Sequence, residues 1–179
     1  AVIDLAAKEV GYLEKASGDL AYLYSKTGNP GSKNYTKYGY ELNKLRPDII
    51  GYPDYWCLTF VSWLFVAAYG YDEARDALCG EIDDWCRSMA NRFDKAGRWI
   101  EKGGSPEVGD IVMFTDGSGE LVHCGIVYEI SSGRIRTIEG NTSSGPQVVP
   151  NGGGVFAKSY ELNSDRIAGY CRPNYSAIT

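Results

Sequence analysis

The chain has 179 residues, a formal net charge of −5 and a sequence pI near 4.9. Its content of 44% hydrophobic and 23% charged residues is typical of one globular domain with a hydrophobic core. The acidic balance, without a run of lysine or arginine, argues against nucleic acid or an anionic membrane as the main partner. The longest apolar run, residues 61–69, has about half the length of a membrane-spanning helix, so we expect no membrane crossing.

The chain begins at Ala1 and shows no basic-then-apolar signal segment, so we expect a processed protein or an excised domain. Five cysteines leave at least one free thiol unless one bonds to another chain. We expect no disulfide between Cys79 and Cys86, and we expect Cys124 and Cys171 to be buried thiols in strands. There is no C-x-x-C pair, and the single histidine lies far from Cys79 and Cys86. We therefore predict no metal site and no cofactor.

The first third of the chain combines one helix with turn-rich segments. The spacing of apolar residues predicts a packing helix over residues 3–15. A loop or irregular helix follows through residue 33 and includes a turn cluster at residues 27–32. Residues 34–40 place three tyrosines in a polar stretch that contains glycine. These rings either pack at half-buried positions or line a groove for a sugar or peptide, and composition alone favours packing.

A buried central helix is predicted to begin at Cys57, because apolar residues recur at positions 57, 60, 61, 64, 65 and 68. Pro53 and Asp54 stand where the chain would enter this helix, and Asp54 is a candidate N-cap. Gly70 is expected to end this helix, because glycine is common directly after the last helical residue. The remaining expected elements are helices over 71–78 and from 83 or 84 to about 98, and strands over 110–114, 121–129, 134–141, about 154–160 and 166–171. Helices first and antiparallel strands after them indicate an α+β fold, with the sheet packed against the central helix.

Cys57 is a candidate nucleophile because it opens that helix. The unpaired N–H groups of a first helical turn, with the positive end of the helix dipole, favour a thiolate. A carboxylate at Asp54 would oppose thiolate formation. The structural alternative is an inert thiol in the core.

A cysteine nucleophile needs a base, and His123 is the only histidine. A three-residue turn at residues 131–133 would pair Asn141 with His123 and Glu139 with Gly125, so that the three polar side chains share one sheet face. A two-residue turn would move Asn141 to the other face.

The same face is expected to meet the central helix near Cys57, because it also carries Leu121, Val127, Ile135 and Thr137. Each polar residue also has a structural interpretation. His123 could be a core histidine with satisfied hydrogen bonds, Glu139 an ion-pair partner of Arg136, and Asn141 a turn residue before Thr142. The combination with a helix-opening cysteine favours catalysis over the separate structural interpretations.

Several motifs have the order and spacing of a known family: Thr36-Lys37-Tyr38-Gly39, Trp56-Cys57-x-x-Phe60-Val61-Ser62-Trp63, Gly109-Asp110-Ile111-Val112-Met113-Phe114, His123-x-Gly125-Ile126-Val127, Thr137-Ile138-Glu139-Gly140-Asn141-Thr142-Ser143, and a closing strand at 167–173. With these motifs the chain resembles the cysteine, histidine-dependent amidohydrolase/peptidase (CHAP) domains of bacterial and phage cell-wall lysins. The resemblance covers residues 34–175 and leaves residues 1–33 as an N-terminal helical extension packed on the domain.

The resemblance implies a papain-like α+β fold, with N-terminal helices packed on a C-terminal antiparallel sheet. It also implies cleavage of an amide bond in peptidoglycan, by an endopeptidase or an N-acetylmuramoyl-L-alanine amidase. Cys57 would be the nucleophile, His123 the base, Glu139 the residue that orients it, and Asn141 a polar supporter. Tyr38 and Trp56 are the candidate substrate contacts. Cys124 departs from the small residue that many relatives have after the histidine, and we expect it in the core.

The resemblance further implies a protein secreted to the cell wall, or encoded by a phage and released at lysis. We expect a monomer with peptidoglycan as partner, and a separate wall-binding domain, because the negative charge gives no attraction to an anionic wall. Some relatives bind calcium before the cysteine, but here that stretch offers only Asp48 and Asp54, so no calcium site is predicted.

Three alternatives stay open at this point. An NlpC-type cell-wall peptidase shares the order of cysteine and histidine, but a single histidine excludes its triad with a second histidine. A catalytically inactive wall-binding module would use the tyrosines and tryptophans to stack on sugar rings. A secreted toxin of the same fold is the third.

Overall fold

The computed structural model describes residues 1–178 and shows an α+β fold, as predicted. Its helices are α1 (Val2–Glu9), α2 (Leu20–Leu23), α3 (Lys37–Leu45), α4 (Cys57–Tyr69), α5 (Tyr71–Ala77) and α6 (Cys86–Lys95), with a 3-10 turn, η1 (Tyr175–Ala177). Its strands are β1 (Trp99–Glu101), β2 (Ile111–Thr115), β3 (Leu121–Ser131), β4 (Arg134–Thr142), β5 (Gly154–Glu161) and β6 (Ile167–Cys171). They form one antiparallel sheet in the order β1-β6-β2-β3-β4-β5. Among residues 1–178, no helix has the length and apolar character needed to cross a membrane.

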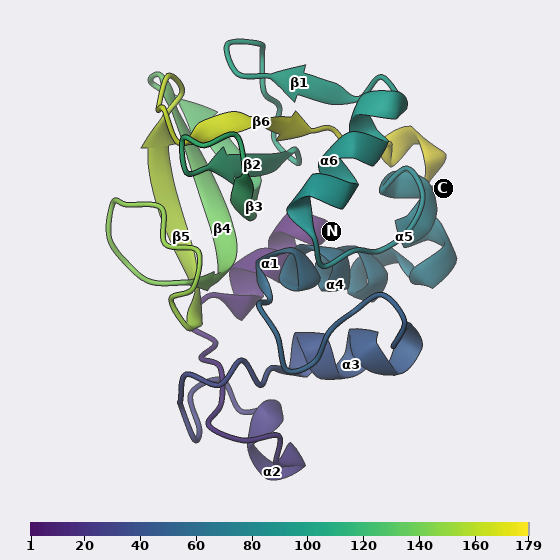
Figure 1. Cartoon of the computed structure of the whole chain (residues 1–179), viewed down its shortest axis with the longest axis vertical. Helices are drawn as coiled ribbons and strands as arrows, with labels where there is room; N and C mark the ends of the chain where they lie inside the picture. The colour runs from purple at the N-terminus through teal and green to yellow at the C-terminus, as the bar shows by residue number, and fades with distance from the viewer. Residues whose placement is uncertain (179) are drawn as a thin grey trace.

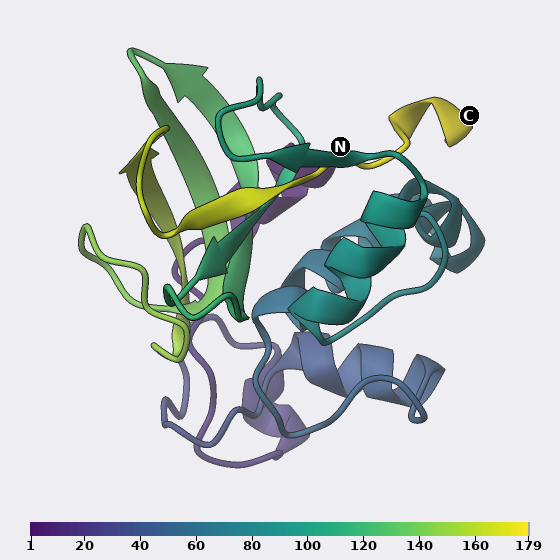
Figure 2. The same cartoon turned by 45° about the horizontal axis from the view of Figure 1, so that its top comes forward.

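The helix α4 is the centre of the main hydrophobic core. In Figures 1 and 2 the sheet lies on one side of the molecule, and α3 to α6 lie on the other. The helix α4 contacts β3 and β4, and its residues 57–65 are all buried. The predicted central helix begins and ends where the sequence pattern placed it. Among the strand residues that pack on it are Cys124, Ile126 and Ile138.

The opposite face of the sheet is also buried, which corrects one prediction. A second hydrophobic cluster there includes Phe114, Val127, Ile135 and Tyr160. The predicted polar face, with Val127 and Ile135, therefore belongs to this second cluster, whereas α4 packs against the face that carries Cys124 and Ile126. The alternation along β3 was predicted correctly, but the choice of face was wrong, because both faces are apolar.

The β3–β4 hairpin keeps the predicted register at its far end by a different route. Ser131 pairs with Arg134, so the turn has two residues, Ser132 and Gly133, both with positive φ (52° and 73°). A β-bulge between Val127 and Glu129 then shifts the pairing by one residue, and Ile126 pairs with Ile138 as a three-residue turn would have required. Two departures from the expected hairpin therefore cancel.

The first helix ends earlier than predicted, at Glu9 instead of residue 15. Gly11 follows with φ 95°, a conformation that other residues rarely adopt, and the chain turns away from the helix axis. Its N–H donates to the carbonyl of Val155, and Val155 N–H donates back to the carbonyl of Tyr12. Residues after Gly11 thus extend the hydrogen bonding at the start of β5. Two further elements, α3 and β1, were not predicted.

Glu14 ties this N-terminal segment to the residue that precedes α4. The Glu14 side chain is buried, and its Oε1 accepts a hydrogen bond from Trp56 Nε1 at 3.2 Å. Its Oε2 accepts from the backbone N–H of Asn34 at 2.6 Å. The indole of Trp56 also stacks on the ring of Tyr38, with 5.7 Å between ring centroids. One carboxylate therefore accepts hydrogen bonds from two donors on two separate segments, one of them fully buried.

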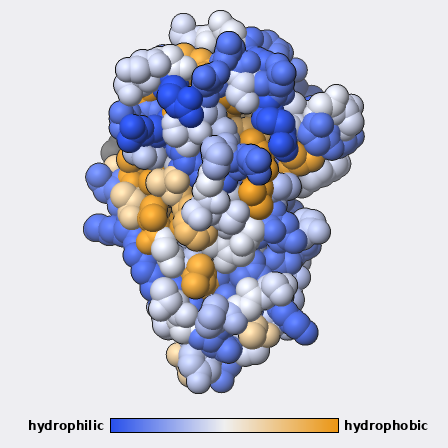
Figure 3. Space-filling view, turned by 90° about the vertical axis from the view of Figure 1, so that its left-hand side faces the viewer, coloured by the Kyte–Doolittle hydropathy of each residue, from blue (hydrophilic) through white to orange (hydrophobic). Residues whose placement is uncertain are grey.

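The surface on the side turned to the viewer in Figure 3 is largely hydrophilic, with hydrophobic residues in small groups between polar ones. This distribution agrees with the acidic composition and with the position of the large apolar side chains in the two buried clusters. The two buried clusters, and the polar groups inside them, are therefore the features that organise the fold.

We predict that Glu14→Gln lowers the free energy of unfolding by about 1–3 kcal/mol, the cost of leaving one buried donor without an acceptor. The amide has the same shape but a single acceptor oxygen, so either Trp56 or Asn34 faces an NH₂ group. Urea unfolding measures the loss, with Glu120→Gln at an exposed position as the matched control. Equal stability of the two variants would contradict this role of Glu14.

Candidate functional site

Cys57 is the first residue of α4 and retains 8% of its surface exposed. Trp56 occupies the N-cap position and makes no capping hydrogen bond with its side chain. The predicted cap by Asp54 is wrong, since the carboxylate of Asp54 accepts a hydrogen bond from Tyr55 N–H instead. The N–H groups of the first turn are therefore free of a side-chain cap, and the positive end of the helix lies at the Cys57 sulfur.

His123 and Glu139 form a completely buried pair. The Nε2 atom of His123 lies 2.8 Å from Oε1 of Glu139, and neither side chain is exposed. Tyr160 and Thr137 also donate their hydroxyl hydrogens to the Glu139 carboxylate. The imidazole stacks on Phe114, with 5.7 Å between ring centroids and 24° between the planes. The ring is thus fixed on one side by the carboxylate and on one face by an aromatic side chain.

The other ring nitrogen, Nδ1 of His123, is buried and has no hydrogen-bond partner among residues 1–178. Burial alone would lower the pKa of His123, but the Cys57 thiol and the Glu139 carboxylate raise it to about 9. Conversely, the thiols of Cys124 and Cys86 lower the pKa of Cys57 well below that of an ordinary thiol, and His123 adds to this effect against burial. A thiolate beside an imidazolium is the form that both shifts favour.

Cys57 belongs to a cluster of three thiols. The sulfur atoms of Cys57, Cys86 and Cys124 all lie within 4.8 Å of one another, and all three residues are buried. Burial and the neighbouring thiols raise the pKa of Cys124 well above its usual range. Cys124 alone would lower the pKa of Cys86, but Cys57 and burial raise it. The negative charge of the cluster therefore resides on Cys57, with two protonated thiols around it.

Gly125 makes the His123–Glu139 pair possible. A Cβ atom at position 125 would lie 2.5 Å from Cγ of Glu139 and 3.1 Å from the carbonyl oxygen of Ile138. The Glu139 side chain therefore crosses β3 over a residue without a side chain. The predicted juxtaposition of Gly125 and Glu139 is confirmed by this contact.

Asn141 lies apart from the hydrogen bonds of this pair. It occupies an irregularity between β4 and β5 with φ 55°, in the left-handed region that asparagine tolerates. Its side chain is buried, and neither its oxygen nor its nitrogen has a hydrogen-bond partner among residues 1–178. The simple alternation that placed Asn141 on the face of Glu139 does not apply here, because the strand is irregular at this point.

Tyr38 and Trp56, the predicted substrate contacts, are buried in the core. Tyr38 donates its hydroxyl hydrogen to Glu9, and its ring packs against Phe60 and Trp63. These side chains have no surface to offer a substrate, so we assign them to packing, the interpretation that composition favoured.

Tyr160, Cys86 and the role of Cys124 were not predicted from the sequence. The strand that carries Tyr160 was predicted, but its pairing with β4 was not, and this pairing places Tyr160 beside Ile135 on the face of Glu139. The thiols come from α4, α6 and β3. No spacing in the sequence connects these three elements, although the odd number of cysteines and the unusual Cys124 were signals.

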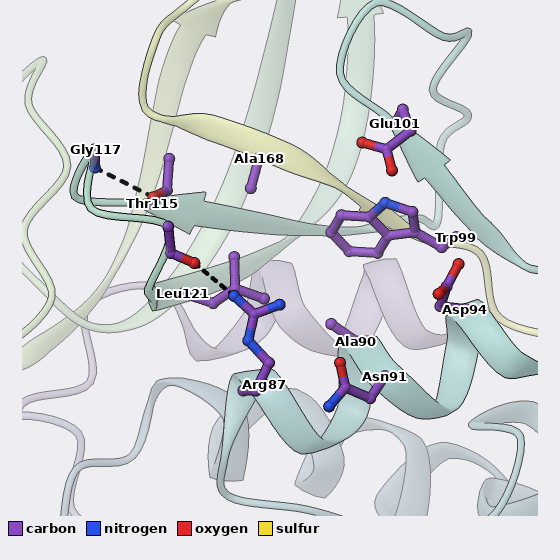
Figure 4. A pocket seen from close by; sticks show the side chains of 11 residues that line it. Arg87, Ala90, Asn91, Asp94, Trp99, Glu101, Thr115, Gly117, Leu121 and Ala168 are labelled. Carbon is purple, nitrogen blue, oxygen red and sulfur yellow. Dashed lines mark hydrogen bonds between the residues drawn. The ribbon is translucent and has the colours of Figure 1, made fainter.

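A pocket of about 460 Å³ lies between α6 and the strands β1, β2 and β6 (Figure 4). Arg87 and Ala90 on α6 line it, together with Leu121 on β3. Arg87 donates a hydrogen bond to the carbonyl oxygen of Gly119 at 2.5 Å and so connects α6 to the β2–β3 loop. Two of its lining residues, Arg87 and Leu121, lie close in the chain to Cys86 and His123. Neither Cys86 nor His123 itself lines the pocket.

We predict that Gly125→Ala displaces Glu139 from His123 and lowers the free energy of unfolding by about 1–3 kcal/mol, as is usual for extra volume in a packed core. Because the chain has a single histidine, NMR of the imidazole follows this contact without overlap. Ala157→Val adds volume at an exposed position of β5 and serves as the control. An unchanged imidazole signal in folded Gly125→Ala would contradict the role assigned to Gly125.

Comparison with known proteins identifies a family and a distant structural likeness. No curated protein is significantly similar to the chain. The crystal structure of Ly7917 is similar to 65% of this chain with 19% sequence identity and a TM-score of 0.43, and the match spans 52% of that protein. Residues 48–141, just over half of the chain, match the model of the CHAP domain, and the chain therefore belongs to the CHAP domain family.

Proposed function

We propose that this protein is a peptidoglycan hydrolase that cleaves an amide bond with Cys57 as nucleophile and His123 as base. Membership of the CHAP family supports the peptidoglycan substrate. The chemistry is supported by the buried hydrogen bond between His123 and Glu139, together with the lowered pKa of Cys57 and the raised pKa of His123, to which each of these two residues contributes. A nucleophile, a base and a group that orients the base, interacting in this order, form the usual unit for acyl transfer.

In this mechanism the Cys57 thiolate attacks the carbonyl carbon, and the new C–S bond gives a tetrahedral intermediate. Its oxyanion lies at the uncapped N-terminus of α4, where the backbone N–H of Cys57 is a donor. Protonated His123 gives its proton to the amide nitrogen, the C–N bond breaks and the amine leaves. His123 then takes a proton from water, the hydroxide attacks the thioester, and the C–S bond breaks to restore the Cys57 thiolate.

Glu139 acts in this scheme as a positioning residue. Its bond to Nε2 places the N–H of the neutral ring on that atom and leaves the Nδ1 lone pair for the thiol proton. The backbone N–H of Lys37 donates to the Tyr12 hydroxyl and is therefore not available as a second oxyanion donor.

Tyr55 and Trp85 replace the buried aromatic residues as proposed substrate contacts. Tyr55 is 60% exposed and stands two residues before Cys57, and Trp85 is 61% exposed and directly precedes Cys86. Since the sulfur atoms of the two cysteines are close, both rings flank the same site. Exposed aromatic rings of this kind stack on sugars and pack on peptide side chains.

The wider setting is part of the same proposal. We propose a papain-like arrangement, action as a monomer, and a location in the cell wall after secretion or after release from a lysed host. The net charge of −5 gives no attraction to an anionic wall, which supports delivery by a separate wall-binding domain. The division into a segment of residues 1–33 and a catalytic domain of residues 34–175 belongs to this proposal as well.

Three other functions are distinguished from this one by experiment. An NlpC-type peptidase would act on the same substrate, but Glu139 occupies the position at His123 that a second histidine would need. A wall-binding module without catalysis, or a toxin of the same fold, would use the same aromatic residues for another purpose. The activation of Cys57 supports catalysis over binding alone.

We predict that Cys57→Ala and His123→Gln each reduce the lysis of purified cell walls by more than about 100-fold, because they remove the nucleophile and the general base. Glutamine keeps an N–H donor for Glu139. Digestion of walls by the wild-type protein should release new amino groups without new reducing sugar ends. The circular dichroism spectra of the two variants should equal that of the wild type. Cys171→Ala, at a buried thiol outside the cluster, is the control. Lysis retained by either site variant would overturn the assignment.

We predict that iodoacetamide modifies Cys57 first at pH 6 to 7 in the reduced chain, as followed by mass spectrometry of peptides that separate Cys57 from Cys79. The pKa of Cys57 is lowered, so its thiolate persists at a pH where other thiols are protonated. Cys79 is more accessible, but burial raises its pKa. Preferential labelling of Cys79 would show that exposure and not activation controls reactivity, and would favour the wall-binding module.

A further inference from the structure

The three-thiol cluster has the composition of a site for a thiophilic metal ion. A tetrahedral zinc ion with Zn–S bonds of about 2.3 Å holds its sulfur ligands about 3.8 Å apart. The sulfur atoms of Cys57, Cys86 and Cys124 already lie within 4.8 Å of one another. Small side-chain rotations therefore suffice to bring all three onto one ion. Thiolate ligands favour zinc and other thiophilic ions over magnesium or calcium.

His123 is the candidate for a fourth ligand: it interacts with Cys57, although it is not one of the side chains whose ligand atoms lie within 4.8 Å of one another. His123 is fully buried, and its Nδ1 atom has no hydrogen-bond partner among residues 1–178. Its Nε2 atom is held by Glu139 at 2.8 Å. A carboxylate that binds one ring nitrogen while the other nitrogen faces the metal is the usual outer shell of a zinc-bound histidine. Glu139 in turn receives hydrogen bonds from Thr137 and Tyr160, which complete this shell.

We propose that Cys57, Cys86, Cys124 and His123 bind one zinc ion in a tetrahedral site with three sulfur ligands and one nitrogen ligand. Three protons leave when the ion binds: one each from Cys86 and Cys124, and one from the Cys57–His123 pair. The site then carries a net charge of −1. Four protein ligands close the coordination sphere and leave no open position for a catalytic water.

Bound zinc would also inhibit hydrolysis. This consequence rests on the proposed function, because the ion occupies both the nucleophile and the base. Hydrolysis should stop when one equivalent of zinc is bound and return when a chelator removes it. Binding itself does not depend on the proposed function, so the two are tested separately.

The binding test uses zinc alone with the full, reduced chain of 179 residues under anaerobic conditions. Competition with a chromophoric chelator should give one ion per chain. Cys86→Ala and Cys124→Ala should each weaken binding by more than about 100-fold, the upper end of the loss when merely an outer-shell partner is removed. Cys171→Ala removes a buried thiol and Cys79→Ala a more accessible one, and both should bind as the wild type does. Equal affinity in all four variants would overturn the proposal.

X-ray absorption at the zinc edge gives an answer that needs no variant. The wild-type chain with one equivalent of zinc should show three sulfur ligands and one nitrogen ligand, and fewer than three sulfur ligands would refute the site. For inhibition, each variant is compared with its own zinc-free rate of wall lysis. One equivalent of zinc should inhibit wild type and Cys171→Ala, whereas Cys86→Ala and Cys124→Ala should resist. A chain that binds zinc as described but never lyses walls would refute the proposed function alone.

Discussion

The site depends on the buried contact between His123 and Glu139. An ionisable pair withdrawn from water stabilises a protein only if its hydrogen-bonding groups are satisfied. Here Thr137 and Tyr160 donate to the carboxylate in addition to the ring, so its two oxygens receive three donors. A carboxylate held in this way favours a protonated ring, and a protonated ring favours a thiolate at Cys57. The charge separation at the nucleophile thus originates in the second hydrophobic cluster.

The position of Cys57 relative to the sheet follows from two neighbouring residues of β3. Successive side chains of a strand point to opposite faces, so His123 belongs to one core and Cys124 to the other. Both interact with the sulfur of Cys57. These two residues stand close to the beginning of β3 at Leu121. The first residue of α4 is therefore influenced by side chains from both faces of the sheet.

Much of this arrangement could be predicted from the sequence, and the failures have identifiable causes. The pattern of α4 is long and strongly periodic, which made its bounds secure. The hairpin register was right because Gly125 leaves room for Glu139, although the turn and the bulge that produce this register were not visible. The packing face was wrong because apolar residues cover both faces. The helix α3 was missed because tyrosine, glycine and polar residues hide its single buried stripe.

Residues outside the matched family segment also support the nucleophile. The match begins at residue 48, yet Trp56 is held by Glu14 and stacks on Tyr38. The Trp56 ring also lies against β4, where a Cβ at Gly140 would approach it to 2.9 Å. The residue before Cys57 is therefore fixed between the N-terminal segment and the strand that carries Glu139. The distance between nucleophile and base is a property of the whole chain, because elements on both sides of the matched segment hold the two ends of this contact.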